Sequence, residues 1–210
     1  MSEKVEVKTF CDLPIEDMWQ NVLDDALGTV GKEAKKEPSD YFKRSILMSK
    51  HSPIRSLIFE VKFESIPSHI TQQFSRHHIA IESLPNMQWQ EDVNPTDIEH
   101  FVKTSRSDRT EVDRNTRKQT DPVSYKFRAN AQGLMDASKK RLCFAADIGA
   151  IKHWNMVKQG IAKICPELAF RMQPECVCSG FCPEDPKLIK CRYAESASFA
   201  EIREGYISRD

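Results

Sequence analysis

The 210-residue chain has no long apolar run, no glycine-rich phosphate loop and no net charge. No stretch approaches the roughly 20 apolar residues that a membrane span needs. Its 7 glycines form neither Gly-x-Gly-x-x-Gly nor Gly-x-x-x-x-Gly-Lys-Ser/Thr, so neither a Rossmann dinucleotide site nor a P-loop is indicated. Lys plus Arg equals Asp plus Glu at 31 each, which argues against a protein that coats nucleic acid or an anionic membrane. Any anion site must be local and built from side chains.

The start of the chain and the number of its cysteines predict a reducing environment. The start, Met1-Ser2-Glu3-Lys4, lacks the basic and apolar regions of a signal peptide, so we expect a cytoplasmic protein. Seven cysteines, an odd number, favour reduced thiols over a disulfide framework.

The length and the 40% apolar content suit one domain over residues 1–210.

Residues 174–210 form a cysteine-containing tail with Cys176, Cys178, Cys182 and Cys191. Their Cys-x-Cys-x-x-x-Cys spacing differs from the paired Cys-x-x-Cys of structural zinc sites, so we expect reduced thiols and no metal. Nothing in the sequence sets one of these thiols beside a base, as a nucleophile would require. A small zinc-stabilised interaction protein remains an alternative, which stoichiometric zinc on these cysteines would support.

Hydropathy periodicity predicts an α/β fold of the α+β kind, with a mixed or antiparallel sheet flanked by helices. Predicted strands cover 4–10 and the alternating stretch through Phe59 and Phe63, which Pro67 ends. Asp12 is predicted to cap a helix that buries Ile15, Met18, Trp19, Val22, Leu23 and Ala26, with Pro14 in its first turn. Other helices are predicted over 41–48, 68–74, 130–142 and 151–164, whereas 84–99, rich in Pro, Asn and acidic residues, is predicted as an insertion or lid loop.

Arg76-His77-His78, preceded by Gln72 and Gln73, concentrates cations and hydrogen-bonding groups just after a predicted strand and short helix. An anionic ligand is expected here. Taken alone, such a cluster is more often ordinary polar surface, so its meaning depends on partners elsewhere in the chain.

The predicted helix over 130–142 supplies candidate partners, because Ala131, Leu134, Met135 and Ser138 mark its inward stripe. Asn130 and Arg141 lie eleven residues apart, which is nearly three turns, so both project from one face about 16 Å apart. That separation suits one extended ligand or two ligands side by side. The alternative is that Asn130 only caps the helix and Arg141 only interacts with its dipole.

Four arginines, Arg76, Arg106, Arg109 and Arg141, could bind phosphate in a bidentate manner, while Gln73 and Asn130 could read a base or an isoalloxazine edge. This set favours nucleotide chemistry. The stretch from Lys103 to Lys118, with six basic and three acidic residues, leaves open a nucleic-acid-binding module, whose binding would weaken steeply with salt.

The ordered set of motifs resembles the flavin-dependent thymidylate synthase family. The motifs that carry the resemblance span about residues 50 to 185: His51-Ser52-Pro53, Gln72-Gln73-Phe74-Ser75-Arg76-His77-His78, Thr104-Ser105-Arg106-Ser107-Asp108-Arg109, Asn130-Ala131-Gln132-x-Leu134, Arg141-Leu142-Cys143, Pro174-x-Cys176 and Gly180-Phe181-Cys182-Pro183-Glu184.

The resemblance implies a homotetramer with active sites shared between subunits. Such an enzyme binds FAD, takes electrons from NADPH and a one-carbon unit from 5,10-methylenetetrahydrofolate, and methylates C5 of dUMP; no membrane or nucleic-acid partner is expected. It implies flavin contacts from Ser52, Arg76, His77, His78 and Asn130. It implies nucleotide contacts from Gln73, Thr104, Ser105, Arg106, Arg109 and Arg141, and catalytic roles for Arg141, His77 and Arg106.

The chain departs from the family pattern at His78, where the family has arginine. The family signature then continues directly into Ser-x-Asn-Glu-x-Ser-x-Arg-Tyr. In this chain, residues 79–83 lead into the predicted loop instead. The Ser-x-Arg portion is therefore matched to Thr104-Ser105-Arg106. A histidine can be neutral near pH 7, so polarisation of the flavin or folate would become pH-sensitive. Methylation, hydroxymethylation and other C5 substitutions of a pyrimidine nucleotide all stay open.

Overall fold

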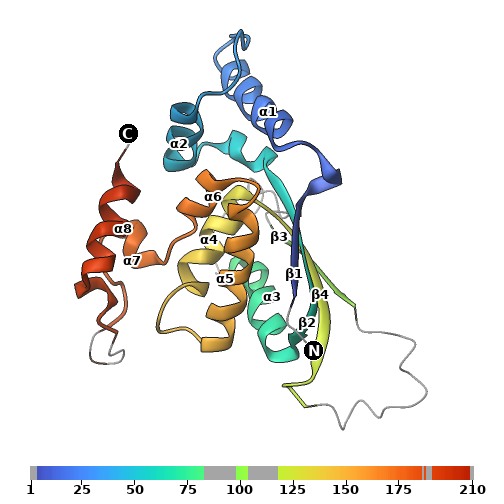
Figure 1. Ribbon diagram of the computed structural model, residues 1–210, viewed down its shortest axis with the longest axis vertical. Coiled ribbons are helices and arrows are strands. Elements are labelled where there is room, and N and C mark those ends of the chain that lie inside the picture. Colours follow the sequence, from blue (N-terminus) through green and yellow to red (C-terminus); the bar gives the residue numbers. More distant parts are fainter. Residues whose placement is uncertain (1–3, 83–97, 104–117, 186, 188–190, 209–210) are drawn as a thin grey trace.

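A computed structural model describes residues 4–82, 98–103, 118–185, 187 and 191–208, and for 76–82 and 98–103 it describes the backbone alone. The fold is α+β, with a four-stranded antiparallel sheet and helices gathered on one of its faces (Figure 1). The predicted α+β class is therefore confirmed. Within the described parts of the chain, no helix is both long and apolar enough to cross a membrane.

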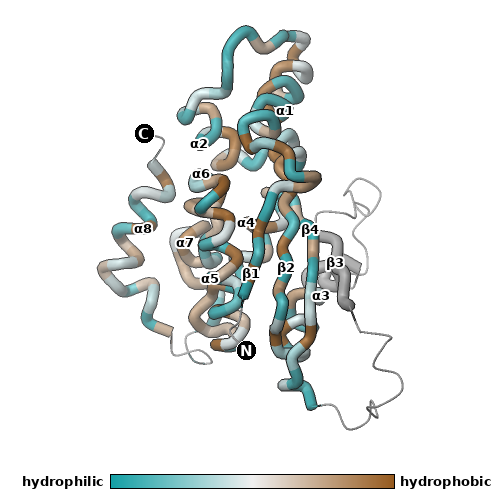
Figure 2. The backbone as a smooth tube through the Cα atoms, turned by 45° about the vertical axis from the view of Figure 1, so that its right-hand side comes forward, coloured by the Kyte–Doolittle hydropathy of each residue, from teal (hydrophilic) through white to brown (hydrophobic). Residues whose placement is uncertain are grey.

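The sheet has the strand order β1-β2-β4-β3, and every pairing is antiparallel. Its strands are β1 (Val5–Thr9), β2 (Ile58–Pro67), β3 (Ile98–Lys103) and β4 (Pro122–Asn130). The register joins Val61 of β2 to Val7 on one side and to Phe127 on the other. Apolar residues alternate with polar ones along β1, β2 and β4 (Figure 2), so one face of the sheet is apolar.

The α-helices of the described residues are α1 (Ile15–Gly28), α2 (Asp40–Ser49), α3 (Ser68–Glu82), α4 (Ala131–Arg141), α5 (Ile148–Ala162), α6 (Pro166–Arg171), α7 (Glu175–Ser179) and α8 (Ala197–Ile207). The same residues also form the 3-10 helices η1 (Phe10–Asp12), η2 (Ser52–Ser56) and η6 (Tyr193–Glu195). Helices α3, α4 and α5 cover the apolar face (Figure 1).

Trp154 on α5 joins the helices to the sheet. Its ring stacks on Phe127 of β4, with centroids 5.8 Å apart, and meets Phe74 of α3 edge-on at 5.1 Å. Its Nε1 donates to Ser138 Oγ of α4 at 2.8 Å, and this hydroxyl in turn donates to Leu134 O. The buried indole N–H is thereby satisfied, so one residue fixes α3, α4, α5 and β4 relative to one another.

The opposite face of β2 and β4 carries charges. Glu60, whose side chain is only 12% exposed, accepts hydrogen bonds from Lys126 at 2.7 Å and Arg128 at 3.2 Å. Burial acts to raise the pKa of Glu60, but the hydrogen bonds from Lys126 and Arg128 outweigh it and hold that pKa below its usual value. This network lies on the polar face of the sheet, opposite the face that the helices cover.

Two predicted boundaries were wrong. Asp12 does not cap α1: it lies in η1 with a φ of 56°, pairs with Lys8, and α1 begins only after Pro14, which takes the cap position instead of the first turn. The helix predicted over 68–74 continues to Glu82, so Arg76-His77-His78 lies inside α3. Of the predicted loop 84–99, residues 84–97 lie outside the described chain, while 98 and 99 open β3.

Candidate functional site

Gln73 of α3 and Arg141 of α4 are in direct contact, although they lie 68 residues apart in the sequence. Arg141 Nη1 donates to Gln73 Oε1 at 3.3 Å, and Nη2 donates to the Gln73 backbone carbonyl. Both side chains are half-buried. Two of the residues assigned to the nucleotide are therefore brought together at the place where α3 and α4 meet.

The position of Arg141 follows from how α4 is built. Strand β4 runs straight into the helix, and the Ala131 N–H donates to Leu57 O at 2.9 Å. The predicted inward stripe of α4 is buried, so the helix cannot rotate about its axis. Arg141 occupies the last turn, where a cation is favoured by the carbonyl end of the helix dipole.

Tyr125 of β4 lies close enough to the Arg141 guanidinium to feel its charge. The Tyr125 side chain is fully buried, and burial raises its pKa well above the usual value, while the positive charge of Arg141 acts in the opposite direction. The phenol is thus neutral at physiological pH. The guanidinium of Arg141 therefore lies beside a neutral phenol.

Asn130 stands at the other end of α4. It is 6% exposed, and its Oδ1 accepts from the Gly133 N–H at 2.9 Å, so it caps the helix as the alternative interpretation foresaw. Ser52, the other described flavin candidate, opens η2 on the surface. The structure therefore gives Asn130 a structural role whether or not it also contacts a ligand.

Helix α3 carries Arg76, His77 and His78 within one turn or so of Gln73. The residues predicted to contact flavin and Gln73, which is predicted to contact the nucleotide, thus share one helix. Thr104, Ser105, Arg106 and Arg109 lie outside the described residues, so their assignment stays a prediction.

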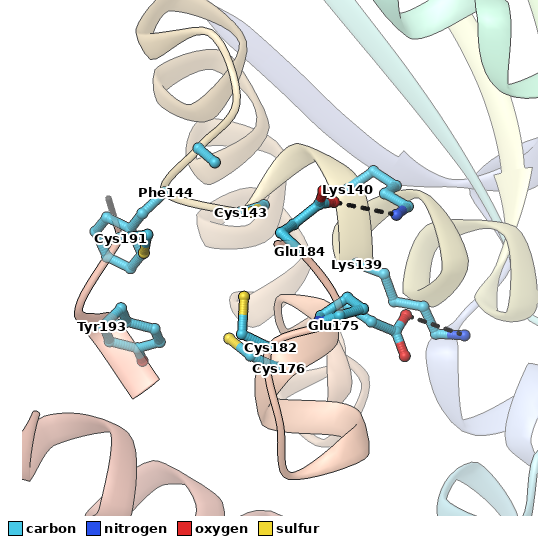
Figure 3. A pocket seen from close by; sticks show the side chains of 12 residues that line it. Lys139, Lys140, Cys143, Phe144, Glu175, Cys176, Cys182, Glu184, Cys191 and Tyr193 are labelled. Carbon is cyan, nitrogen blue, oxygen red and sulfur yellow. Dashed lines mark ion pairs between the residues drawn. The ribbon is translucent and has the colours of Figure 1, made fainter. Parts of the chain in front are cut away.

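A separate hollow gathers thiols from distant parts of the chain. It is lined by Cys143, just beyond α4, by Cys176 in α7, and by Cys182 and Cys191 (Figure 3). Burial, together with the neighbouring thiols of Cys143, Cys182 and Cys191, raises the pKa of Cys176 to about 11. The sequence did not associate Cys143 with the other three, since only the fold brings it to them.

Sequence reasoning also missed Tyr125. The signal was present, because Val123, Tyr125, Phe127 and Ala129 alternate with polar residues as a half-buried strand does.

No protein-family model matches the chain, and no curated protein matches it either.

Proposed function

We propose that the chain is a flavin-dependent enzyme that methylates C5 of dUMP, with the fold and activity of the flavin-dependent thymidylate synthase family. The observation that carries the proposal is the contact between Gln73 and Arg141. Two residues assigned to one ligand from separate motifs must lie close together, and α3 and α4 bring them into hydrogen-bonding distance.

The residue types at this junction fit a pyrimidine nucleotide. A guanidinium can fork onto a phosphate or donate to a carbonyl oxygen, and an amide can both donate to and accept from the base. Gln73 occupies two donors of Arg141: Nη1 donates to the side-chain amide, and Nη2 donates to the backbone carbonyl. Only the first bond joins two half-buried side chains, so an incoming anion can replace the amide at Nη1.

The same helices offer donors for the flavin. Arg76, His77 and His78 follow Gln73 on α3, and Ser52 is exposed at the start of η2. The hydroxyl, the imidazoles and the guanidinium suit a cofactor that carries phosphates and ring carbonyls, and no glycine-rich loop takes that part. FAD would supply the redox step, and the protein would supply binding and orientation.

Arg141 has the clearest task in the proposed reaction. Uracil C5 becomes nucleophilic once a nucleophile has added at C6, and negative charge then develops on O4. A guanidinium that is already ordered stabilises this charge without reorganisation. His77 and Arg106 are proposed to assist, and the one-carbon unit and the electrons come from methylenetetrahydrofolate and NADPH. Sites shared between the subunits of a homotetramer would bring further groups to the same place.

A ligand screen tests the proposal. We expect FAD to bind, to give the purified protein the yellow colour of oxidised flavin, and to raise its melting temperature. We expect dUMP to raise it further than dCMP or UMP does. Colourless protein that cannot be reconstituted with FAD and is not stabilised by any pyrimidine nucleotide would contradict the proposal.

A further inference from the structure

The C-terminal segment from α7 to α8 packs against the domain with little apolar burial. Helix α8 buries no residue, and Val177 is the one buried residue of α7. Within the segment, Arg203 Nη1 of α8 donates to the carbonyl oxygens of Val177 and Cys178. The segment is joined to the domain by Arg171 of α6, which donates to Tyr206 O, and by the ring pairs Phe144–Tyr193 and Phe170–Tyr206. Small units with so little core are commonly held by a metal or a disulfide.

The thiol hollow lies where this segment meets the end of α4. Four of the seven cysteines line it, and they come from three places in the chain. Figure 3 shows the sulfur atoms of Cys176 and Cys182 directed into the space that Cys143 and Cys191 border. We propose that Cys143, Cys176, Cys182 and Cys191 bind one structural zinc ion, which fastens the C-terminal segment to α4.

The remaining three cysteines lie elsewhere. Cys11 is exposed in η1, and Cys165 is buried in the main core. Cys178 is two residues from Cys176 on the same short helix, yet its Sγ lies 3.7 Å from Gln173 O, and it lines a different hollow together with Arg203. The ligand set is therefore not the sequence-adjacent group of four: the fold exchanges Cys178 for Cys143.

The size of the hollow selects among thiolate-bound metals. Its volume of about 20 Å³ has room for a single ion or water and is small for a four-iron cluster. In the described part of the chain, no three side chains of the ligand types are yet arranged to hold a metal. Binding must therefore draw the thiols inward, toward the Zn–S distance of about 2.3 Å.

The charges around the hollow suit an anionic zinc site. Binding releases one proton from each of four thiols and forms a tetrathiolate complex of net charge −2, since +2 and four times −1 are combined. Lys139 and Lys140 stand at the rim beside Glu175 and Glu184, so the lysines can offset this charge only in part. They are already ordered by Glu175 and Glu184, each pair with an N–O distance of 3.9 Å.

Zinc content of the full-length protein tests the proposal. Protein expressed with zinc and purified under reducing conditions should hold about one zinc per chain. We expect Cys176→Ser and Cys191→Ser each to lower the zinc content at least fivefold. Cys178→Ser, which changes a thiol two residues away outside the hollow, should keep it. FAD content, measured in parallel, reports on the proposed function independently.

Cobalt titration of the wild-type protein needs no variant to fold. It should give the charge-transfer and ligand-field bands of a tetrahedral thiolate site, and zinc should abolish them. Four outcomes would overturn the proposal: no zinc or cobalt bound by reduced protein, equal losses in Cys178→Ser and Cys176→Ser, iron with sulfide in place of zinc, or a disulfide between two lining cysteines of protein kept reduced. Limited proteolysis should cut the C-terminal segment faster once zinc is removed.

Discussion

Replacing Arg141 separates its structural role from its proposed role in binding. In the free protein, Arg141→Ala removes the two hydrogen bonds to Gln73. The Gln73 carbonyl lies within α3 and can keep its helical hydrogen bond, so this carbonyl is not left without a donor. We therefore expect the free energy of unfolding to fall by only about 1–2 kcal/mol.

The effect on nucleotide binding should be larger. A hydrogen bond from a charged donor contributes about 1.5–3 kcal/mol, which corresponds to a loss of about 10- to 150-fold in dUMP affinity. FAD content should stay unchanged, because Arg141 is assigned to the nucleotide alone. Isothermal titration of FAD-loaded protein with dUMP measures the affinity, and flavin absorbance measures the cofactor.

Arg128→Ala is the matched control. Arg128 also makes charged hydrogen bonds, but to Glu60 on the sheet face that the helices do not cover. It should lose comparable stability and keep its affinity for dUMP. Unchanged dUMP binding in Arg141→Ala, or an equal loss in both variants, would refute the assignment of Arg141.

Three further predictions concern the flavin and the fold. His77→Ala should lower FAD content while dUMP still binds, the reverse of Arg141→Ala; equal effects of both changes on both ligands would refute this division. Gly160→Ala should destabilise the protein in urea by about 1–2 kcal/mol although alanine favours helix, because its Cβ would lie 2.3 Å from Val7 Cγ2. Val7→Ala should lower the free energy of unfolding less in the Gly160→Ala background than in the wild type. If the two losses simply add, the clash between the alanine side chain at position 160 and Val7 is excluded. Glu60→Gln should lower stability at pH 7 by about 1–2 kcal/mol and flatten its decline in acid. The depressed pKa of Glu60 implies stability that is complete above the unfolded pKa of about 4.3 and lost as pH falls through the native pKa, so an unchanged acid profile would contradict the network.

The sequence predicted those elements whose signals are local. Apolar and polar residues alternate in β2, and apolar residues recur every 3.6 positions in α1 and α4. These patterns predict which face is buried, and Met18 and Leu134 are indeed in the core. The full length of α3 was missed because the polar run after Phe74 offers no apolar stripe. It also offers no glycine or proline before Pro85, and that absence was the signal that the helix continues.

The candidate site could be predicted only in part, since its contacts join distant segments. The sequence nominated Gln73 and Arg141 separately, but their hydrogen bonds depend on how α3 and α4 pack on the sheet. Tyr125 was not predicted as a neighbour of Arg141, because the strand that carries it was not recognised. Cys178 was grouped with the other C-terminal thiols because they are close in sequence, whereas only the fold brings Cys143 to the hollow.

Release of tritium from C5-labelled dUMP, measured together with the mass of the product, tests the central claim most directly, because substitution at C5 displaces the label. We predict release that requires FAD, NADPH and methylenetetrahydrofolate together, that falls strongly in Arg141→Ala and that persists in Arg128→Ala. The mass of the product would distinguish a methyl from a hydroxymethyl group. Folded protein loaded with FAD that releases no tritium from dUMP under these conditions would contradict the proposed function.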